Sequence, residues 1–271
     1  MKRHSKLIAL ISLLGACDEK TATPTSFDFS STAVIGGQEV PSDSPVAPIT
    51  AAILTDGKFG CSASILSPKL VLTAAHCVTR GNYPGPETQR TEPERVEVGF
   101  GRSLEPGENL ERRAVSAILV HSRWFDESTV TAFSDLGDIA LVRLRDEIPE
   151  GYHPATLLGR DQSLEIDQEV MVAGYGVHNS QYDWDGLLRF AERLFVRETW
   201  EFGQSEVLLD QTRGQSVCAG DSGGPAYRMI HSKIYLWGVA SRTERDPDER
   251  CDSHIVYTRI DAYKDWIDAQ Y

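Results

Sequence analysis

The chain has 271 residues, of which 41% are hydrophobic, 25% charged and 8% aromatic, and its formal net charge is −13. This composition is typical of a globular protein with one or two sizeable cores. An acidic surface repels nucleic acid and anionic lipid, which carry the same sign of charge, and no Lys/Arg cluster offsets it along the body of the chain. We therefore expect no nucleic-acid partner.

The first residues are typical of an export signal. Three Lys or Arg residues stand among the first six, Leu7–Leu14 is a short apolar run, and Gly15 and Ala16 precede Cys17. The apolar run is too short to span a bilayer. Residues Leu14 to Cys17 resemble the lipobox of bacterial lipoproteins, in which the cysteine carries the lipid. The alternative is an ordinary signal peptide that happens to contain a cysteine.

The chain has five cysteines, an odd number that would leave one thiol unpaired in an exported protein. If Cys17 carries lipid, four remain, which is the right parity for two disulfides in an oxidising compartment. Residues 18–33 are rich in Ser, Thr and Asp and show no periodicity, so we interpret them as a flexible tether or propeptide.

These features divide the chain into a signal peptide over residues 1–17, a tether or propeptide over 18–33, and one folded domain over 34–271. We expect an exported protein, either anchored to a membrane through Cys17 as a precursor or secreted or periplasmic in its mature form.

From Val34 onward, short apolar runs alternate with Gly, Pro and polar clusters. Many short strands separated by turn signals favour a sandwich or barrel over βαβ units. The predicted strands are Ala51–Leu54, Ser62–Leu66, Leu70–Thr73, Arg95–Val98, Val115–Val120, Ile139–Leu144, Val170–Gly174, Glu206–Leu209, Ile234–Ala240 and Ile255–Arg259. One C-terminal helix with one apolar face is predicted, with Asp261 as its N-cap and Tyr263, Trp266, Ile267 and Gln270 recurring at helical spacing.

The segment Gly220–Pro225, with the sequence GDSGGP, has the composition that a nucleophilic serine needs. A serine hydroxyl reacts only when a neighbouring base takes its proton, and the developing oxyanion needs backbone N–H groups presented by a tight turn. Glycines on both sides of Ser222 permit such a turn. Taken alone, a Gly-rich segment that contains serine is more often an ordinary loop.

Two further segments carry the other residue types that this chemistry requires. His76 ends an apolar strand beside Cys77, and Asp138 opens the buried run Ile139–Val142. Separately, each has a simpler explanation, as a structural histidine or a strand cap, and Asp135 is a competing carboxylate. Together they supply a base and an orienting acid for Ser222.

The runs Thr73–Cys77, Asp138–Leu141 and Gly220–Pro225 resemble the three signature segments of chymotrypsin-like serine proteases, in that family's order of His, Asp and Ser. The resemblance covers the chain from Val34 to the C-terminal helix. It implies an all-β fold of two six-stranded antiparallel barrels with a C-terminal helix. The implied function is that of a secreted serine endopeptidase that cleaves proteins or peptides through an acyl-enzyme.

The resemblance also assigns roles. Ser222 would be the nucleophile, His76 the base and Asp138 the acid that orients it, while the N–H groups of Gly220 and Ser222 would bind the oxyanion. Asp138 is preferred to Asp135 because only Asp138 directly precedes Ile-Ala-Leu. The resemblance pairs the cysteines as Cys61 with Cys77 and Cys218 with Cys251.

The segment beginning Val34-Ile-Gly-Gly resembles the mature N-terminus of the family, whose α-amino group pairs with the Asp before the nucleophile, here Asp221. We therefore expect a zymogen that is cut after Ala33, although Val34 could instead simply open a first strand. The family's activation bond usually follows Arg or Lys, so Ala33 is a departure. Cutting there would also release the domain from any lipid on Cys17.

By the same resemblance, Ser216 lies at the floor of the specificity pocket, Ser241 and Thr243 begin its entrance wall, and Ile255 replaces a usual glycine on the opposite wall. Ser216 cannot select Arg or Lys as an Asp would, and Ile255 would shorten the pocket. This pattern resembles elastases and favours small or uncharged side chains. Such a pocket would accept Ala33, so the protease could activate itself.

Two rival functions differ from this one in kind. An inert homologue would use the same barrels as a binding module, although all three triad positions are filled here. An esterase would turn over esters without cutting peptides. The seven histidines show no paired ligand spacing, so we expect no metal and no cofactor. We expect a monomer.

Overall fold

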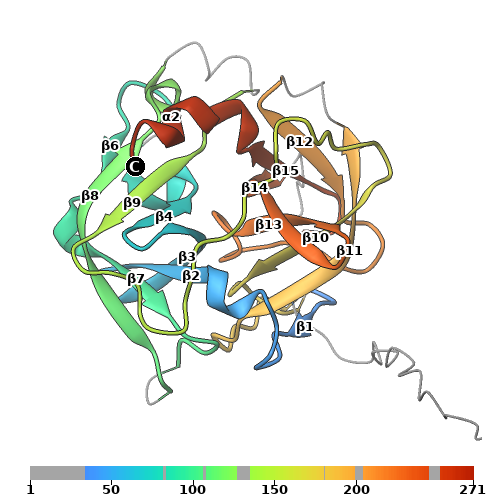
Figure 1. Cartoon of the computed structure of the whole chain (residues 1–271), viewed down its shortest axis with the longest axis horizontal. Coiled ribbons are helices and arrows are strands. Elements are labelled where there is room, and N and C mark those ends of the chain that lie inside the picture. The colour runs from blue at the N-terminus through green and yellow to red at the C-terminus, as the bar shows by residue number, and fades with distance from the viewer. Residues whose placement is uncertain are drawn as a thin grey trace, which may run out of the picture. The chain divides into compact units, whose positions relative to one another are not determined.

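The computed structural model describes residues 34–81, 84–105, 108–126, 135–179, 181–198, 204–243 and 251–271. The predicted signal peptide, the tether and Cys17 lie outside the described residues. Fifteen strands, labelled in Figure 1 where room allows, form the described part together with short helices. The strands are β1 (Gln38–Glu39), β2 (Thr50–Thr55), β3 (Lys58–Ser67), β4 (Leu70–Thr73), β5 (Thr79–Arg80), β6 (Gln89–Arg90), β7 (Val96–Phe100), β8 (Glu111–Val120), β9 (Ala140–Leu144), β10 (Glu169–Gly174), β11 (Arg189–Glu198), β12 (Glu206–Asp210), β13 (Pro225–Ile230), β14 (Lys233–Thr243) and β15 (His254–Arg259).

The strands close into two antiparallel barrels, which confirms the fold predicted from the sequence. The first barrel has the order β2-β3-β4-β9-β8-β7. In the second, β11-β10-β13-β14-β15-β12 follow one another, and β11 pairs with β12 to close the ring. The short strand β1 also pairs with β11. In Figure 1 the first barrel lies at the left and the second at the right.

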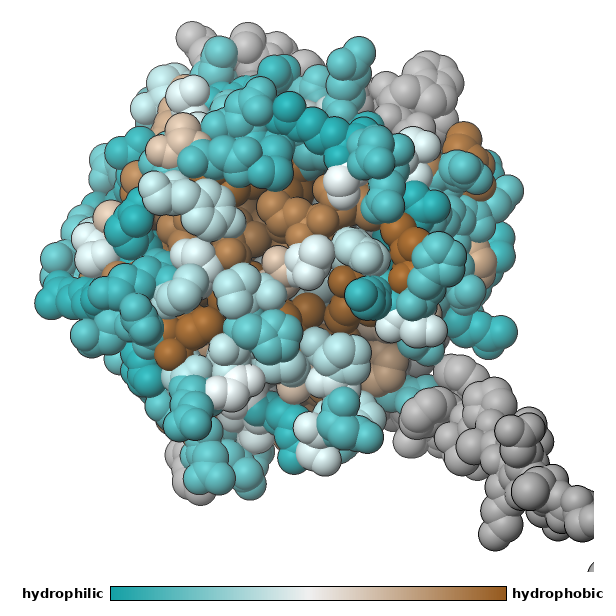
Figure 2. Space-filling model, in the orientation of Figure 1, coloured by the Kyte–Doolittle hydropathy of each residue, from teal (hydrophilic) through white to brown (hydrophobic). Residues whose placement is uncertain are grey.

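Two apolar clusters that share the strands of the first barrel explain why so many strands are apolar on both faces. In β2, Ala51 and Ile53 face the interior of the first barrel, whereas Ala52 and Leu54 belong to a cluster shared by both barrels. Alternate residues of a strand point to opposite faces, so a barrel strand at the contact between barrels is buried twice. Figure 2 shows apolar side chains gathered in the centre of this face, within a mostly hydrophilic surface.

The C-terminal helix is present but begins differently from the prediction. A 3₁₀ turn, Asp261–Tyr263, precedes α2 (Lys264–Asp268), and no side chain caps either one. The predicted N-cap at Asp261 is wrong because its carboxylate accepts hydrogen bonds from the Arg259 guanidinium, at 3.0 Å from Nε and 2.5 Å from Nη2.

Four further 3₁₀ helices, Ala47–Ile49, Ala75–Val78, Pro93–Arg95 and Ser122–Phe125, connect the strands. In the described part of the chain, no helix is long and apolar enough to cross a membrane.

Candidate active site

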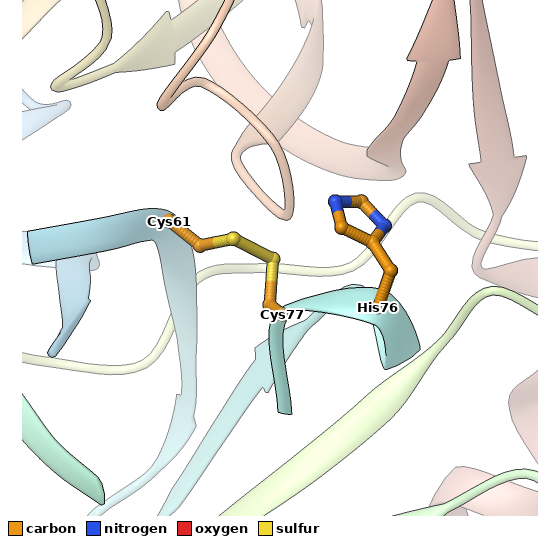
Figure 3. A group of neighbouring side chains, drawn as sticks. All are labelled: Cys61, His76 and Cys77. Atoms are coloured by element: carbon orange, nitrogen blue, oxygen red, sulfur yellow. A yellow bond between two sulfur atoms is a disulfide. The ribbon is translucent and has the colours of Figure 1, made fainter. Parts of the chain in front are cut away.

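His76 lies on a short turn that follows a fully buried strand. β4 ends at Thr73, and the 3₁₀ helix Ala75–Val78 then lifts the imidazole out of the barrel wall. A disulfide joins Cys77 to Cys61 of β3, the pair that the resemblance implies, so the turn is fastened to the neighbouring strand (Figure 3). Such a bridge typically contributes about 2–4 kcal/mol, mostly by restricting the unfolded chain.

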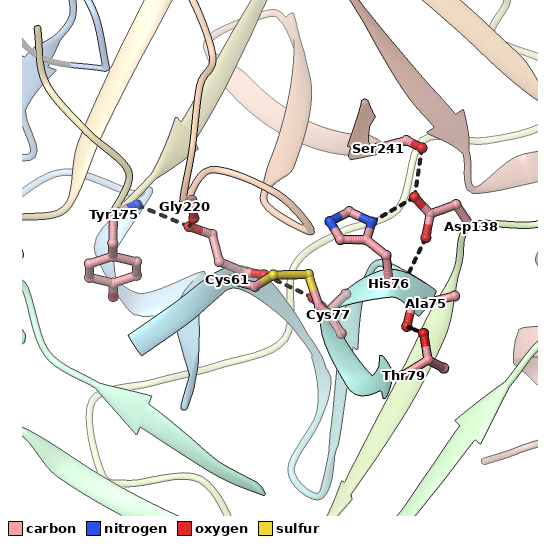
Figure 4. The surroundings of a disulfide bond; sticks show 11 residues. Cys61, Ala75, His76, Cys77, Thr79, Asp138, Tyr175, Gly220 and Ser241 are labelled. Carbon is pink, nitrogen blue, oxygen red and sulfur yellow. Dashed lines mark hydrogen bonds and ion pairs between the residues drawn. A yellow bond between two sulfur atoms is a disulfide. The ribbon is translucent and has the colours of Figure 1, made fainter. Parts of the chain in front are cut away.

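Asp138 holds His76 through two hydrogen bonds (Figure 4). The imidazole Nδ1 lies 2.8 Å from Asp138 Oδ2, and the His76 backbone N–H donates to Oδ1 at 3.0 Å. The Asp138 side chain is 2% exposed and that of His76 16%. This geometry fixes the orientation of the imidazole ring and leaves Nε2 as the nitrogen able to accept a proton from another group.

The charges of this pair support each other. Burial would lower the pKa of His76, but the adjacent Asp138 carboxylate outweighs it and the pKa is raised. Burial would raise the pKa of Asp138, but His76, together with hydrogen bonds from Ser241 and from the His76 backbone, holds it below its ordinary value. The carboxylate is thus kept ionised beside an imidazole that gains proton affinity.

Ser241, predicted as part of a pocket wall, makes a second contact that the sequence did not reveal. Its hydroxyl donates to Asp138 Oδ2 at 2.6 Å (Figure 4), and the hydroxyl of Thr258 donates to the Asp138 carbonyl at 3.1 Å. Both come from the second barrel, whereas Asp138 precedes β9 of the first. No local sequence signal marks these partners because they depend on how the two barrels meet.

The competing carboxylate, Asp135, is occupied elsewhere. Its Oδ1 accepts from the backbone N–H of Ser205 at 3.0 Å and also from the Ser205 hydroxyl, and Arg123 lies 3.8 Å from Oδ2. Of the two carboxylates, Asp138 is therefore the one that contacts His76.

The loop that carries Ser222 packs tightly against the first barrel. Gly223 has φ +75°, and a Cβ there would lie 2.1 Å from the hydroxyl of Thr73 at the end of β4. The carbonyl of Ser222 accepts from the Ser62 N–H at 2.8 Å, and the Ser62 hydroxyl donates to the Gly220 carbonyl at 3.0 Å. Only glycine fits at position 223, and the close approach places Ser222 beside the turn of His76.

Asp221 is buried, 2% exposed, and its carboxylate accepts hydrogen bonds from two backbone N–H groups. Its Oδ1 accepts from the Gly176 N–H at 2.9 Å and its Oδ2 from the Cys218 N–H at 3.0 Å. Burial raises its pKa to about 7, against the opposing effect of these two bonds. Val34 is 1% exposed in the apolar interior of the second barrel, and Ile35 pairs with Ser216.

A cavity of about 310 Å³ opens beside Ser222. It is lined by segments 217–219 and 240–243 and by Tyr182, Ser222, Cys251 and Ile255. Three of the predicted pocket residues, Ser241, Thr243 and Ile255, therefore lie at this cavity. Ser216 is buried next to the lining, where its N–H donates to the Ile35 carbonyl at 2.8 Å, and it is not among the lining residues.

Residues 34–267 match the family model described as Trypsin. The chain belongs to the trypsin family. It is 25% identical to chymotrypsin-C of Mus musculus, over 96% of this chain and 97% of that one. It is 28% identical to the urokinase-type plasminogen activator of Gallus gallus over 93% of this chain, which spans 60% of that protein.

A third trypsin-family relative is phenoloxidase-activating factor 3 of Holotrichia diomphalia, at 24% identity over 93% of this chain and 75% of that protein. Among solved structures, neuropsin, a serine protease expressed in mouse brain, superposes with a TM-score of 0.66 and 22% identity, covering 86% of this chain and 98% of that chain. This likeness shows the shared fold.

Two remaining features of this trypsin-family chain concern sulfur. Cys218 is joined to Cys251, again the pair that the resemblance implies, which ties the loop of Ser222 to the segment before β15. Donor atoms of Cys61, His76 and Cys77 lie within 4.8 Å of one another. Because both sulfurs are bonded to each other (Figure 3), they offer no thiolate, so this group does not have the chemistry of a metal centre.

Proposed function

We propose that this trypsin-family chain is an exported serine endopeptidase that hydrolyses peptide bonds through an acyl-enzyme. The observation that carries the proposal is the chain of hydrogen bonds from Ser241 through Asp138 to His76, next to a cavity lined by Ser222. Ser222 Oγ attacks the carbonyl while His76 Nε2 accepts its proton and later returns it to the leaving amine.

In this scheme Asp138 fixes the imidazole tautomer and stabilises the imidazolium that forms. The N–H groups of Gly220 and Ser222 bind the oxyanion, for which the positive φ of Gly220, +91°, gives the loop its tight turn. The substrates are proteins or peptides, as in the relatives. The acidic charge argues against a nucleic-acid partner, and we propose a monomer.

The cavity supports a preference for small or uncharged side chains. Ile255 is 4% exposed and pairs with Thr243 across β14 and β15, so its branched side chain takes space on the wall of the cavity. We expect Ile255→Gly to raise kcat/KM for a Phe substrate relative to an Ala substrate by about 10- to 100-fold, since each apolar group in a pocket discriminates by that order.

The measurement is kcat/KM on paired peptide substrates that differ only at the residue before the cut. Ile166→Gly is the matched control, because Ile166 is 51% exposed and does not line the cavity. An unchanged Phe-to-Ala ratio in Ile255→Gly would mean that this wall does not set the preference.

For activation, we propose a cut between Ala33 and Val34, after which the new α-amino group pairs with Asp221. A buried carboxylate is unfavourable in its ionised form, and the pKa of about 7 in the uncut chain expresses that cost. The cut also separates the domain from Cys17, which we propose as a lipid anchor of the precursor. The two disulfides lie within the domain and do not hold the leader to it.

This proposal predicts a pH dependence for the uncut chain. Because the pKa of Asp221 is about 7 folded and near 3.8 unfolded, its contribution to stability is complete below about pH 4 and is lost as pH rises through 7. The difference corresponds to on the order of 4 kcal/mol in the free energy of unfolding. Denaturant titrations at pH 4 and 8, on a Ser222→Ala precursor that cannot cut itself, should show the loss, and an added Asp221→Asn should remove most of it.

The function itself is tested with a fluorophosphonate probe, intact mass and N-terminal sequencing on the full chain, the chain starting at Val34, and a Ser222→Ala control. Labelling of the Val34 chain alone supports both nucleophile and activation site. A folded Val34 chain that stays unlabelled would favour the inert binding module. A labelled chain that turns over esters but cuts no peptide library would favour the esterase.

A further inference from the structure

A buried ion pair lies beside the proposed triad. Glu206, the first residue of β12, is 1% exposed, and its carboxylate binds the guanidinium of Arg242 in β14 through two bonds, Nη1–Oε1 at 3.0 Å and Nη2–Oε2 at 2.8 Å. The Arg242 side chain is 24% exposed. Removing such charges from water is costly, and an apolar pair of similar volume often stabilises as well, so a buried pair calls for a role besides stability.

Glu206 also reaches into the first barrel. Its Oε1 accepts from the backbone N–H of Leu136 at 3.1 Å, two residues before Asp138. On the neighbouring strand β15, Thr258 pairs with Glu206 and donates its hydroxyl to the Asp138 carbonyl at 3.1 Å. Glu206 and Thr258, which pair across β12 and β15, therefore hold the backbone of Leu136 and of Asp138 in the first barrel.

Arg242, the other half of the pair, adjoins the third contact. The register between β14 and β15 shifts between Ala240 and Arg242, so Ser241 lies in a bulge. A bulge re-aims the side chain that it carries, and Ser241 here donates to Asp138 Oδ2 at 2.6 Å. Arg242 Nη1 is 3.5 Å from the Ser241 hydroxyl oxygen. Fixing the guanidinium on Glu206 thus fixes the strand end that presents this hydroxyl.

We propose that Glu206 and Arg242 are positioning residues: their buried ion pair sets the carboxylate of Asp138, and through it the imidazole of His76, by holding Leu136 on one side and Ser241 on the other. The inference rests on the proposed protease function. Glu206 does not line the cavity beside Ser222, whereas Arg242 does, so the role assigned to Glu206 involves no contact with substrate.

The test compares Glu206→Gln, which keeps an oxygen for the Leu136 N–H but loses the charge, with Glu206→Met, which loses both. In the activated chain we expect Glu206→Met to lower kcat by about 10- to 100-fold, with KM within about threefold, and Glu206→Gln to lower kcat less. The readout of position is the downfield proton resonance of His76 Nδ1–H, which should shift or broaden in Glu206→Met.

The matched control is Arg259→Gln, which breaks the Arg259–Asp261 pair at the end of β15. It should change the melting temperature while leaving kcat and the His76 resonance in place. If Glu206→Met does not fold, Glu206→Gln decides, since it retains part of the contact and should lower kcat by about 3- to 10-fold.

Unchanged kcat in the folded Glu206 variants would overturn the inference, as would a rise in KM alone, which would make the pair part of a binding site. A wild-type chain that starts at Val34 and fails to react with the fluorophosphonate would instead overturn the proposed function. The two failures are therefore distinguishable.

Discussion

Replacing Ser222 by alanine is expected to lower kcat for peptide hydrolysis by on the order of 10⁶-fold, because the acyl-enzyme can no longer form. The small rate that remains above uncatalysed hydrolysis in water would come from the oxyanion site and substrate binding. The fold should survive, since Ser222 is held through its backbone carbonyl, which accepts from Ser62 and is unaffected by the change. The measurement is kcat on a fluorogenic peptide with the chain starting at Val34.

Ser67→Ala is the matched control for this experiment. Ser67 ends β3, and its hydroxyl accepts a local, exposed bond from the Lys69 N–H at 3.3 Å. Its kcat should equal that of the wild type. Hydrolysis by a folded Ser222→Ala chain at more than about a hundredth of the wild-type rate would remove Ser222 from the role of nucleophile.

Asp138→Asn is expected to lower kcat by about 10⁴-fold at neutral pH, because the amide can donate to Nδ1 and favour the wrong imidazole tautomer. Asp138 raises the pKa of His76 while burial lowers it, so without the carboxylate only the lowering effect remains. The acidic limb of the kcat/KM profile, which requires neutral His76, should therefore move to lower pH. The measurement is kcat/KM from pH 4 to 9.

Asp135→Asn supplies the comparison. Its amide oxygen can still accept from the Ser205 N–H, and the side chain does not contact His76, so activity should stay within about threefold and the acidic limb should not move. A larger loss of kcat/KM in Asp135→Asn than in Asp138→Asn would reverse the assignment of the two carboxylates.

Local patterns predicted most of the barrel strands but missed two long ones. In β11 the buried residues Ala191, Leu194 and Val196 are separated by three positions and then two, so the alternation that marks a strand is broken. The structure shows why: a register irregularity lies in its pairing with β10, between Val170 and Val172. β13 begins at Pro225, inside the segment interpreted as the nucleophile loop.

The residues of the candidate site likewise include some that local sequence motifs predict and some that they do not. His76, Asp138 and Ser222 each lie in a contiguous motif with a chemical reason for its composition, so the sequence indicates all three. The bond from Ser241 to Asp138 and the pair of Glu206 with Arg242 depend on strand register and on the contact between barrels. No spacing along the chain encodes such contacts, and the N-cap predicted at Asp261 failed because Arg259 competes for the carboxylate.

His76 and Asp138 come from the first barrel, whereas Ser222 and Ser241 come from the second, and both disulfides join residues within a single barrel. In the described part of the chain, the main chain passes between the barrels from β1 to β2 and again from β9 to β10, and the second passage lies between the segment of Asp138 and that of Ser222. Peptide hydrolysis would then require the two barrels to be in contact. A chain divided between Leu144 and Glu169 should therefore give two fragments that are inactive separately and active when mixed.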